Sequence, residues 1–96
     1  MVMRLETHQL EGLDDRSRVF NRHVDLTRME NGYVANFYYE GQLYLSDPQP
    51  TMKEALHQLV RRLHPLGFKG LRSRLNFRGQ RYLAEREPWV NYQNAT

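Results

Sequence analysis

The sequence predicts an α+β fold in which one amphipathic helix packs on one face of an antiparallel β-sheet. Residues 51–64 carry apolar side chains at helical spacing behind a capping motif. The segments before and after them alternate apolar and polar residues between turn-forming residues, a pattern typical of antiparallel strands. The expected order is β-β-β-α-β-β, with residues 2–8 as a candidate extra strand at the N-terminus.

The chain of 96 residues has the size of one domain, and we expect residues 1–96 to form it. Apolar residues make up 40% of the chain, too large a share for a disordered protein. The absence of cysteine excludes disulfides and zinc–thiolate sites, and no apolar run approaches the roughly 20 residues that span a bilayer. The N-terminus carries Glu6 and lacks the apolar segment of a signal peptide. We therefore expect a cytoplasmic protein without a membrane partner.

The first hairpin is predicted to turn at Asn31-Gly32, between strands at residues 19–29 and 33–38. Asn-Gly favours a two-residue type I′ turn, because both central residues of that turn have positive φ. Counting outward from this turn, Leu26 lies opposite Phe37. The apolar face then collects Val24, Leu26, Ala35 and Phe37. Because register and apolar pattern agree, they support the hairpin.

Two registers compete at the second turn. A two-residue loop of Glu40 and Gly41 would place Leu43 and Leu45 on the polar face of the sheet. A three-residue loop that begins at Tyr39 places Gly41 in a left-handed position and both leucines on the apolar face. We expect the three-residue loop because it satisfies the glycine and the leucines together.

The helix is predicted over residues 51–64. Thr51 and Glu54 form a capping box at its start, while Pro65 and Gly67 favour its end. One stripe of the helix collects the apolar residues Met52, Ala55, Leu56, Leu59, Val60 and Leu63. This stripe has only the apolar sheet face to cover, so we expect the two to pack together.

Two further strands are predicted after the helix, at residues 71–78 and 81–84. In the first of these, the apolar positions alternate with an arginine-rich outer face. Pro88 ends the second. Trp89, Val90 and Tyr92 are then expected to fold back over an edge of the core, since a single Trp in a small domain is usually buried.

No motif in the chain indicates catalysis, and we expect neither a cofactor nor a metal. His57 and His64 lack the spacing of a metal-binding helix motif, so ordinary surface histidines are the better interpretation. Neither a nucleophile elbow nor a glycine-rich phosphate loop occurs. An enzyme is therefore the weaker hypothesis, although a site assembled from distant residues leaves no mark in the sequence.

Arginine is concentrated in the C-terminal half. Residues 1–50 contain five basic and eight acidic side chains, a net charge of −3, whereas residues 51–96 contain nine and three, a net charge of +6. Alternation places several arginines on the sheet face away from the helix, together with two tyrosines. The candidate binding residues are Arg72, Arg74, Arg78, Arg81, Tyr38 and Tyr44.

An Arg- and Tyr-rich sheet face can grip phosphates and stack bases, so the leading hypothesis is a non-catalytic module that binds RNA or an acidic protein partner. A solvated face whose charges protect an edge strand is the plainer interpretation. The rival hypothesis is a small enzyme or ligand-binding protein with a pocket between helix and sheet. The chain is expected to be a monomer or a homodimer paired through its edge strands.

Three stretches carry local resemblances, two of them to characterised families and one to an uncharacterised family. Residues 32–37 (GYVANF) and 51–56 (TMKEAL) resemble the strand and helix signature of HicB-type antitoxins, small domains that cover a toxin's RNA-cleaving face. The same stretch is loosely similar to double-stranded RNA-binding domains. Residues 75–83 (LNFRGQRYL) resemble a signature of short bacterial α+β proteins. The first two resemblances imply the local β-β-β-α order, and neither implies site residues.

Overall fold

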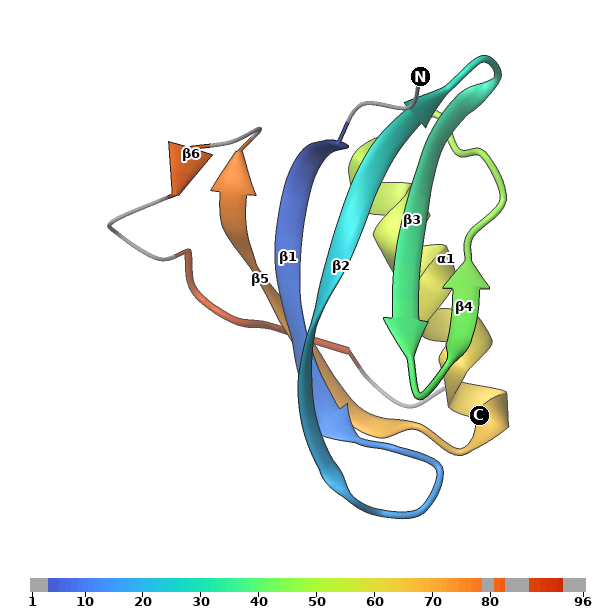
Figure 1. The fold of residues 1–96 in the computed structure, drawn as a ribbon, viewed down its shortest axis with the longest axis vertical. Coiled ribbons are helices and arrows are strands. Elements are labelled where there is room, and N and C mark those ends of the chain that lie inside the picture. Colours follow the sequence, from blue (N-terminus) through green and yellow to red (C-terminus); the bar gives the residue numbers. More distant parts are fainter. Residues whose placement is uncertain (1–3, 79–80, 83–86, 93–96) are drawn as a thin grey trace.

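Antiparallel strands dominate the computed structural model, which describes residues 4–78, 81–82 and 87–92 (Figure 1). The predicted α+β class is confirmed. The strands are β1 (Arg4–Leu13), β2 (Val19–Met29), β3 (Gly32–Tyr39), β4 (Gln42–Leu45), β5 (Lys69–Arg78), β6 (Arg81–Tyr82) and β7 (Val90–Asn91). Within the described ranges they form one sheet in the order β4-β3-β2-β1-β5-β6, with β7 also pairing with β5. The N-terminal strand is part of this sheet and is longer than the candidate at residues 2–8.

The helix α1 (Met52–Leu63) lies where the sequence predicts it. The Thr51 hydroxyl accepts a hydrogen bond of 3.1 Å from the backbone N–H of Glu54, as in a capping box. A 3₁₀ turn, η1 (His64–Leu66), follows and ends at Gly67 in a left-handed conformation, with φ at 107°. The helix buries Ala55, Leu56, Leu59, Val60 and Leu63 against the sheet. No helix in the described part of the chain has the length and apolar character needed to cross a membrane.

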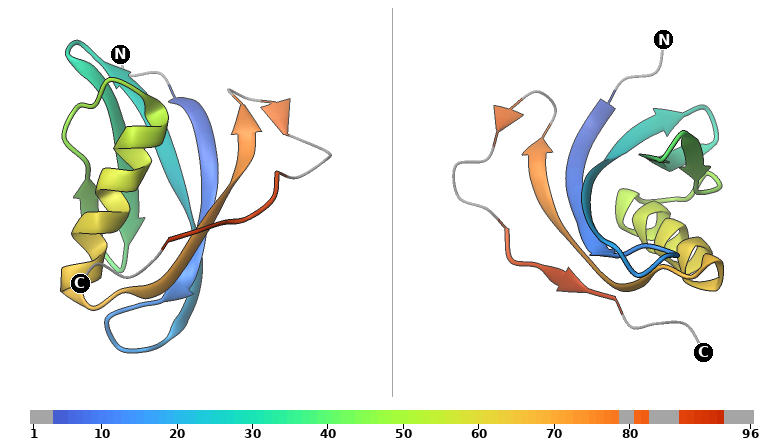
Figure 2. Two further views of the ribbon diagram at one scale, coloured as in Figure 1. Left: turned by 180° about the vertical axis from the view of Figure 1, so that it is seen from behind. Right: turned by 60° about the horizontal axis from the view of Figure 1, so that its bottom comes forward.

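The sheet curves around α1, so that the helix lies in its concave side (Figure 2). β2 and β3 lie against the helix, whereas β5 and β6 diverge from it. The core between the helix and the sheet is filled by fully buried side chains from β1, β2, β3, α1 and β5, including Leu10, Val24, Leu26, Phe37, Leu59 and Leu71. β1 lies between β2, which packs against the helix, and β5, which diverges from it. The space between α1 and β5 is therefore available for a pocket.

The first hairpin turns one residue earlier than the predicted Asn31-Gly32. Met29 pairs with Gly32, so the loop is residues 30–31 and the predicted register is wrong by two residues. Gly32 is not a turn residue but allows a close backbone approach. A Cβ there would lie 2.7 Å from the backbone oxygen of Gln49, which pairs with Tyr33. A shift of two residues preserves the faces of a strand. The four predicted apolar-face residues, Val24, Leu26, Ala35 and Phe37, are accordingly all buried.

The second turn is the two-residue loop that the sequence analysis rejected. Tyr39 pairs with Gln42, which leaves Glu40 and Gly41 in the loop. Both loop residues have positive φ, at 51° and 77°. This is the type I′ pattern, whose twist matches that of the flanking strands. Glu40 therefore accepts a left-handed conformation that is costly for a residue with a Cβ, and the three-residue loop is wrong.

This register places each side chain of β4 on the face opposite to the one predicted for it. Leu43 and Leu45 lie on the outer face and are 57% and 43% exposed. Tyr44 points to the helix side, where its ring centroid lies 5.8 Å from that of Phe37 and 6.0 Å from that of Phe68. An aromatic ring has taken the place in the core that the sequence analysis assigned to the leucines.

One buried carboxylate ties the β1–β2 loop to β3. Asp14 is completely inaccessible to solvent and accepts hydrogen bonds from the Tyr39 hydroxyl at 2.7 Å and the Arg18 Nε at 2.8 Å. The backbone N–H groups of Arg16 and Arg18 each donate a further bond of 2.9 Å. Burial alone would raise the pKa of Asp14, but these four donors together hold that pKa far below its ordinary value. The carboxylate is therefore charged and fully satisfied.

The C-terminal segment runs along the edge of β5. The Tyr92 N–H donates to the Leu71 carbonyl at 2.9 Å, and Tyr92 packs against the core as predicted. Trp89 is only half buried and lies on the outer face, away from the core position expected for it. Its ring is covered by the guanidinium groups of Arg72 and Arg74, at 4.4 and 4.2 Å from the ring centroid. The predicted strand residues 83–84 lie outside the described residues.

Candidate functional site

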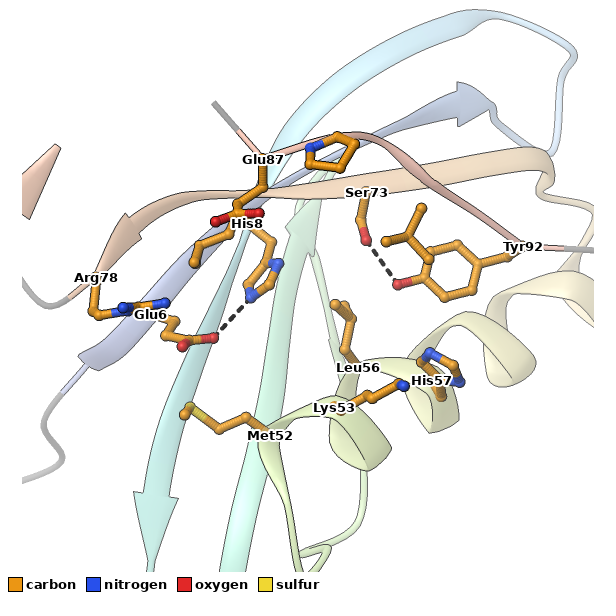
Figure 3. Close-up of a pocket in the computed structure, with 13 residues that line it drawn as sticks. Glu6, His8, Met52, Lys53, Leu56, His57, Ser73, Arg78, Glu87 and Tyr92 are labelled. Atoms are coloured by element: carbon orange, nitrogen blue, oxygen red, sulfur yellow. Dashed lines mark hydrogen bonds and ion pairs between the residues drawn. The ribbon is translucent and has the colours of Figure 1, made fainter. Parts of the chain in front are cut away.

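A pocket of about 430 Å³ lies between the first two turns of α1, the strands β1 and β5, and the C-terminal segment (Figure 3). We call it the helix–sheet pocket. It is lined by Glu6, His8, Met52, Lys53, Leu56, His57, Ser73, Leu75, Arg78, Glu87, Pro88, Val90 and Tyr92. Its volume lies within the roughly 300–1,000 Å³ typical of small-molecule sites. Four separate parts of the chain contribute to it.

A β-bulge at Asn76 brings Arg78 into this pocket. Phe77 pairs with Thr7 and Leu75 pairs with His8, so Asn76 is an extra residue on β5. One extra residue reverses the alternation of side chains beyond it. Arg78 consequently lies opposite Glu6 on the helix side of the sheet, whereas uninterrupted alternation would leave it on the outer face.

Glu6 and His8 form a polar pair on one wall of the pocket. They are two residues apart on β1 and therefore point to the same face. The His8 Nε2 lies 3.0 Å from the Glu6 Oε1, and their side chains are 16% and 17% exposed. This bond fixes the orientation of the imidazole and leaves its second nitrogen for another partner.

Ser73 and Tyr92 form a second polar pair on the opposite side of the pocket (Figure 3). The Ser73 hydroxyl lies 2.7 Å from the Tyr92 hydroxyl, and either can donate. Burial raises the pKa of Tyr92, an effect that the hydrogen bond from Ser73 partly offsets. The Tyr92 phenol is therefore protonated at neutral pH and keeps its capacity to donate a hydrogen bond.

The helix contributes the basic part of the wall. Lys53 and His57 are four residues apart on α1 and lie on one face of the helix. Figure 3 shows Lys53 extending toward His57, whose ring packs edge-on against Tyr92 with centroids 5.2 Å apart. Burial lowers the pKa of His57, and the positive charges of Lys53 and Arg61 lower it further. Lys53 thus lies close enough to His57 for its charge to act on the ring.

The floor between these polar groups is apolar. Met52 and Leu56 reach it from the helix, Leu75 from β5 and Val90 from β7. An apolar floor with a few convergent polar groups is the usual construction of a small-molecule site. The floor can hold the body of a ligand while the polar pairs orient it.

The structure does not bring the predicted binding residues together on one face. Arg78 and Tyr44 point to the helix side, whereas Arg72 and Arg74 lie on the outer face. Tyr38 is 65% exposed on the outer face of β3, three strand spacings from β5, which is about 14 Å at ~4.8 Å each. Arg81 pairs with Arg78 through the β5–β6 ladder, and its side chain lies outside the described part of the chain.

The outer-face arginines are already engaged. Arg72 forms a short ion pair with Glu11, and the Arg74 Nε donates to the Gln9 Oε1 at 2.9 Å. Both guanidinium groups also cover Trp89. The expected convergence of Arg72, Arg74 and Arg78 is therefore wrong beyond the bulge, and only the first two share a surface.

A second cavity, of about 320 Å³, lies next to the buried Asp14. Its wall includes Arg18, Glu40 and Tyr39. Arg18 pairs with Glu40 at 2.9 Å and with Asp14, and Tyr39 also donates to Asp14. Because these polar groups already satisfy one another, the cavity belongs to the network that holds the β1–β2 loop.

Sequence reasoning missed Glu6, His8, Ser73 and Tyr92 as site residues. The spacing of Glu6 and His8 on a strand could have marked them as neighbours on one face. Nothing in the sequence pairs them with Ser73 or Tyr92, because that proximity depends on the β1–β5 pairing. No cluster of three or more potential metal-ligating side chains occurs in the described ranges. A comparison of the chain with family models, curated proteins and solved structures finds no match.

Proposed function

We propose that this protein binds a small organic molecule in the helix–sheet pocket. The observation that carries the proposal is the combination of a 430 Å³ cavity with an apolar floor and two polar pairs, Glu6–His8 and Ser73–Tyr92, at its sides. The paired groups retain hydrogen-bonding capacity toward the cavity, because a histidine has a second nitrogen and a hydroxyl has further lone pairs. Such groups can orient a ligand without rearranging.

The chemistry of the lining argues for a ligand site and against a simple packing gap. Ser73 is 1% exposed, so its hydroxyl has been placed in a nearly dry environment at a desolvation cost. In a gap between apolar side chains, an alanine at this position would avoid that cost. A buried hydroxyl held by Tyr92 at the edge of a cavity is the arrangement that a polar ligand would use.

A fragment screen by NMR tests this proposal. We expect a subset of fragments to shift the backbone amide signals of His8, Ser73 and Tyr92. Val90→Trp should abolish this binding, because Val90 lines the pocket but is 49% exposed, so a larger ring there fills the pocket without entering the core. Val19→Trp is the matched control, since Val19 is 85% exposed and lines neither cavity. Fragments that bind Val90→Trp as well as they bind the original chain would refute the proposal.

Binding of single-stranded RNA is a second candidate function, which one observation favours. Arg72 and Arg74 cover Trp89 on the outer face, and guanidinium groups beside an aromatic ring can contact phosphate and base together. Their bonds to Glu11 and Gln9 would have to be exchanged for contacts with the nucleic acid. Titration with a generic single-stranded RNA at two salt concentrations tests this. Phosphate contact predicts a steep loss of affinity with salt, and no binding at low salt excludes this candidate.

A further inference from the structure

We infer that the ligand of the helix–sheet pocket is an amphiphilic monoanion, with a carboxylate head at Lys53 and His57 and an apolar body over the floor. This inference rests on the proposed function and specifies the ligand class. Lys53 and His57 occupy one rim, while Met52, Leu56 and Val90 supply apolar surface beside them. A molecule with one charged end and one apolar end matches both surfaces at once.

The head group is placed by the charges around the pocket. Lys53 forms no ion pair with any residue in the described ranges, and Arg61 adds positive charge about two turns further along α1, one turn beyond His57. On the far wall, Glu6 is already bonded to His8 and lies opposite Arg78 in the β1–β5 register. Arg78 thus faces a carboxylate, whereas Lys53, on the helix rim, has no carboxylate partner in the described ranges.

The number of charges on the ligand follows from the same residues. The lining contains two permanent cations, Lys53 and Arg78, and two carboxylates, Glu6 and Glu87. A ligand with one negative charge can pair with Lys53 at the helix rim. A dianion would bring two charges to a rim where Lys53 is the one permanent cation that the described lining supplies, so the second charge would lack a partner there and would be repelled by Glu6 and Glu87.

The neutral form of His57 fits this role. Its pKa is lowered, so at neutral pH the ring carries one N–H that can donate to a carboxylate oxygen beside the Lys53 ammonium. Cavities of about 150 Å³ hold a benzene ring, so 430 Å³ has room for a ring or a medium-length alkyl chain together with its head group. An alkyl or aryl monocarboxylate is the expected chemical class.

Calorimetry with three probes of eight carbons each tests the inference: octanoate, octanamide and octyl phosphate. We expect octanoate to bind about tenfold more tightly than octanamide, since a charge-assisted contact is stronger than its neutral counterpart. Octyl phosphate should bind less tightly than octanoate. Lys53→Gln should reduce the octanoate affinity to about that of octanamide, and it should lower the octanamide affinity far less. Lys69→Gln removes the other lysine of the chain, which lies outside the pocket, and should change neither affinity.

The outcomes separate the inference from the function on which it rests. Equal affinities for octanoate and octanamide, or equal losses in Lys53→Gln and Lys69→Gln, would overturn the placement of the head group. If octyl phosphate binds more tightly than octanoate, the inference that the ligand carries a single negative charge is wrong. If none of the three probes binds while screened fragments still shift Ser73 and Tyr92, the ligand class is wrong and the pocket remains a ligand site. If no fragment perturbs the pocket, the proposed function itself fails.

Discussion

Replacing Tyr44 by alanine measures how much of the core depends on the register of β4. Tyr44 is half buried, and its ring contacts those of Phe37 and Phe68 at centroid distances of 5.8 and 6.0 Å. Truncating a fully buried Phe costs about 3–5 kcal/mol, and each aromatic pair contributes about 0.5–1.5 kcal/mol beyond its burial. For a half-buried ring with two such pairs, we expect Tyr44→Ala to lower the unfolding free energy by about 2–3 kcal/mol.

Leu43→Ala is the matched control on the same strand. Leu43 is 57% exposed on the outer face, so its truncation should change the unfolding free energy by less than ~0.5 kcal/mol. Urea denaturation followed by circular dichroism measures both variants, and the slope with denaturant should stay the same. In a domain of this size, the Tyr44 variant should also melt about 10–20 °C lower. A larger loss in Leu43→Ala than in Tyr44→Ala would refute this register and restore the three-residue loop.

Three further predictions concern the core and the loops. Leu59→Ala should cost about 2–5 kcal/mol in urea denaturation, because Leu59 is fully buried, and an unchanged midpoint would contradict the packing of α1 on the sheet. Gly12→Ala should cost about 1–3 kcal/mol by the same assay, since its Cβ would lie 2.9 Å from the carbonyl oxygens of Lys69 and Gly70; a neutral effect would exclude this close approach. The folded-state pKa of Asp14 is depressed, so its stabilisation is present above the unfolded pKa of about 4 and is lost as the pH falls below it. Asp14→Asn should make the unfolding free energy depend less on pH below about pH 4. An unaltered pH dependence would mean that Asp14 does not drive acid unfolding.

The two hairpins show why local sequence predicts faces better than registers. Both predicted turns were misplaced. The first error shifted the pairing by two residues, which keeps every side chain on its face, so the core of β2 and β3 was predicted correctly. The second error shifted it by one residue, which exchanged Tyr44 for Leu43 and Leu45. In the observed register, Gly32 lies against Gln49 of the connection between β4 and α1, and the turn residues do not encode this contact.

The helix was predictable because its signals are local. The capping residues Thr51 and Glu54, the apolar stripe and the exit at Gly67 all lie within one short segment. The pocket was not predictable in the same way. Glu6 and Arg78 meet through the pairing of strands far apart in the sequence, and a single extra residue at Asn76 decides to which face Arg78 points.

The position of Trp89 makes it a natural optical reporter. It is the only tryptophan of the chain, and it lies on the outer face over Arg72 and Arg74, outside the core. Its neighbours Pro88 and Val90 belong to the wall of the pocket. Intrinsic fluorescence therefore follows the attachment of this segment to β5, while circular dichroism follows the sheet as a whole. Two transitions at different denaturant concentrations would reveal a pocket wall that detaches before the domain unfolds, and ligand occupancy could be read from the same indole without any label.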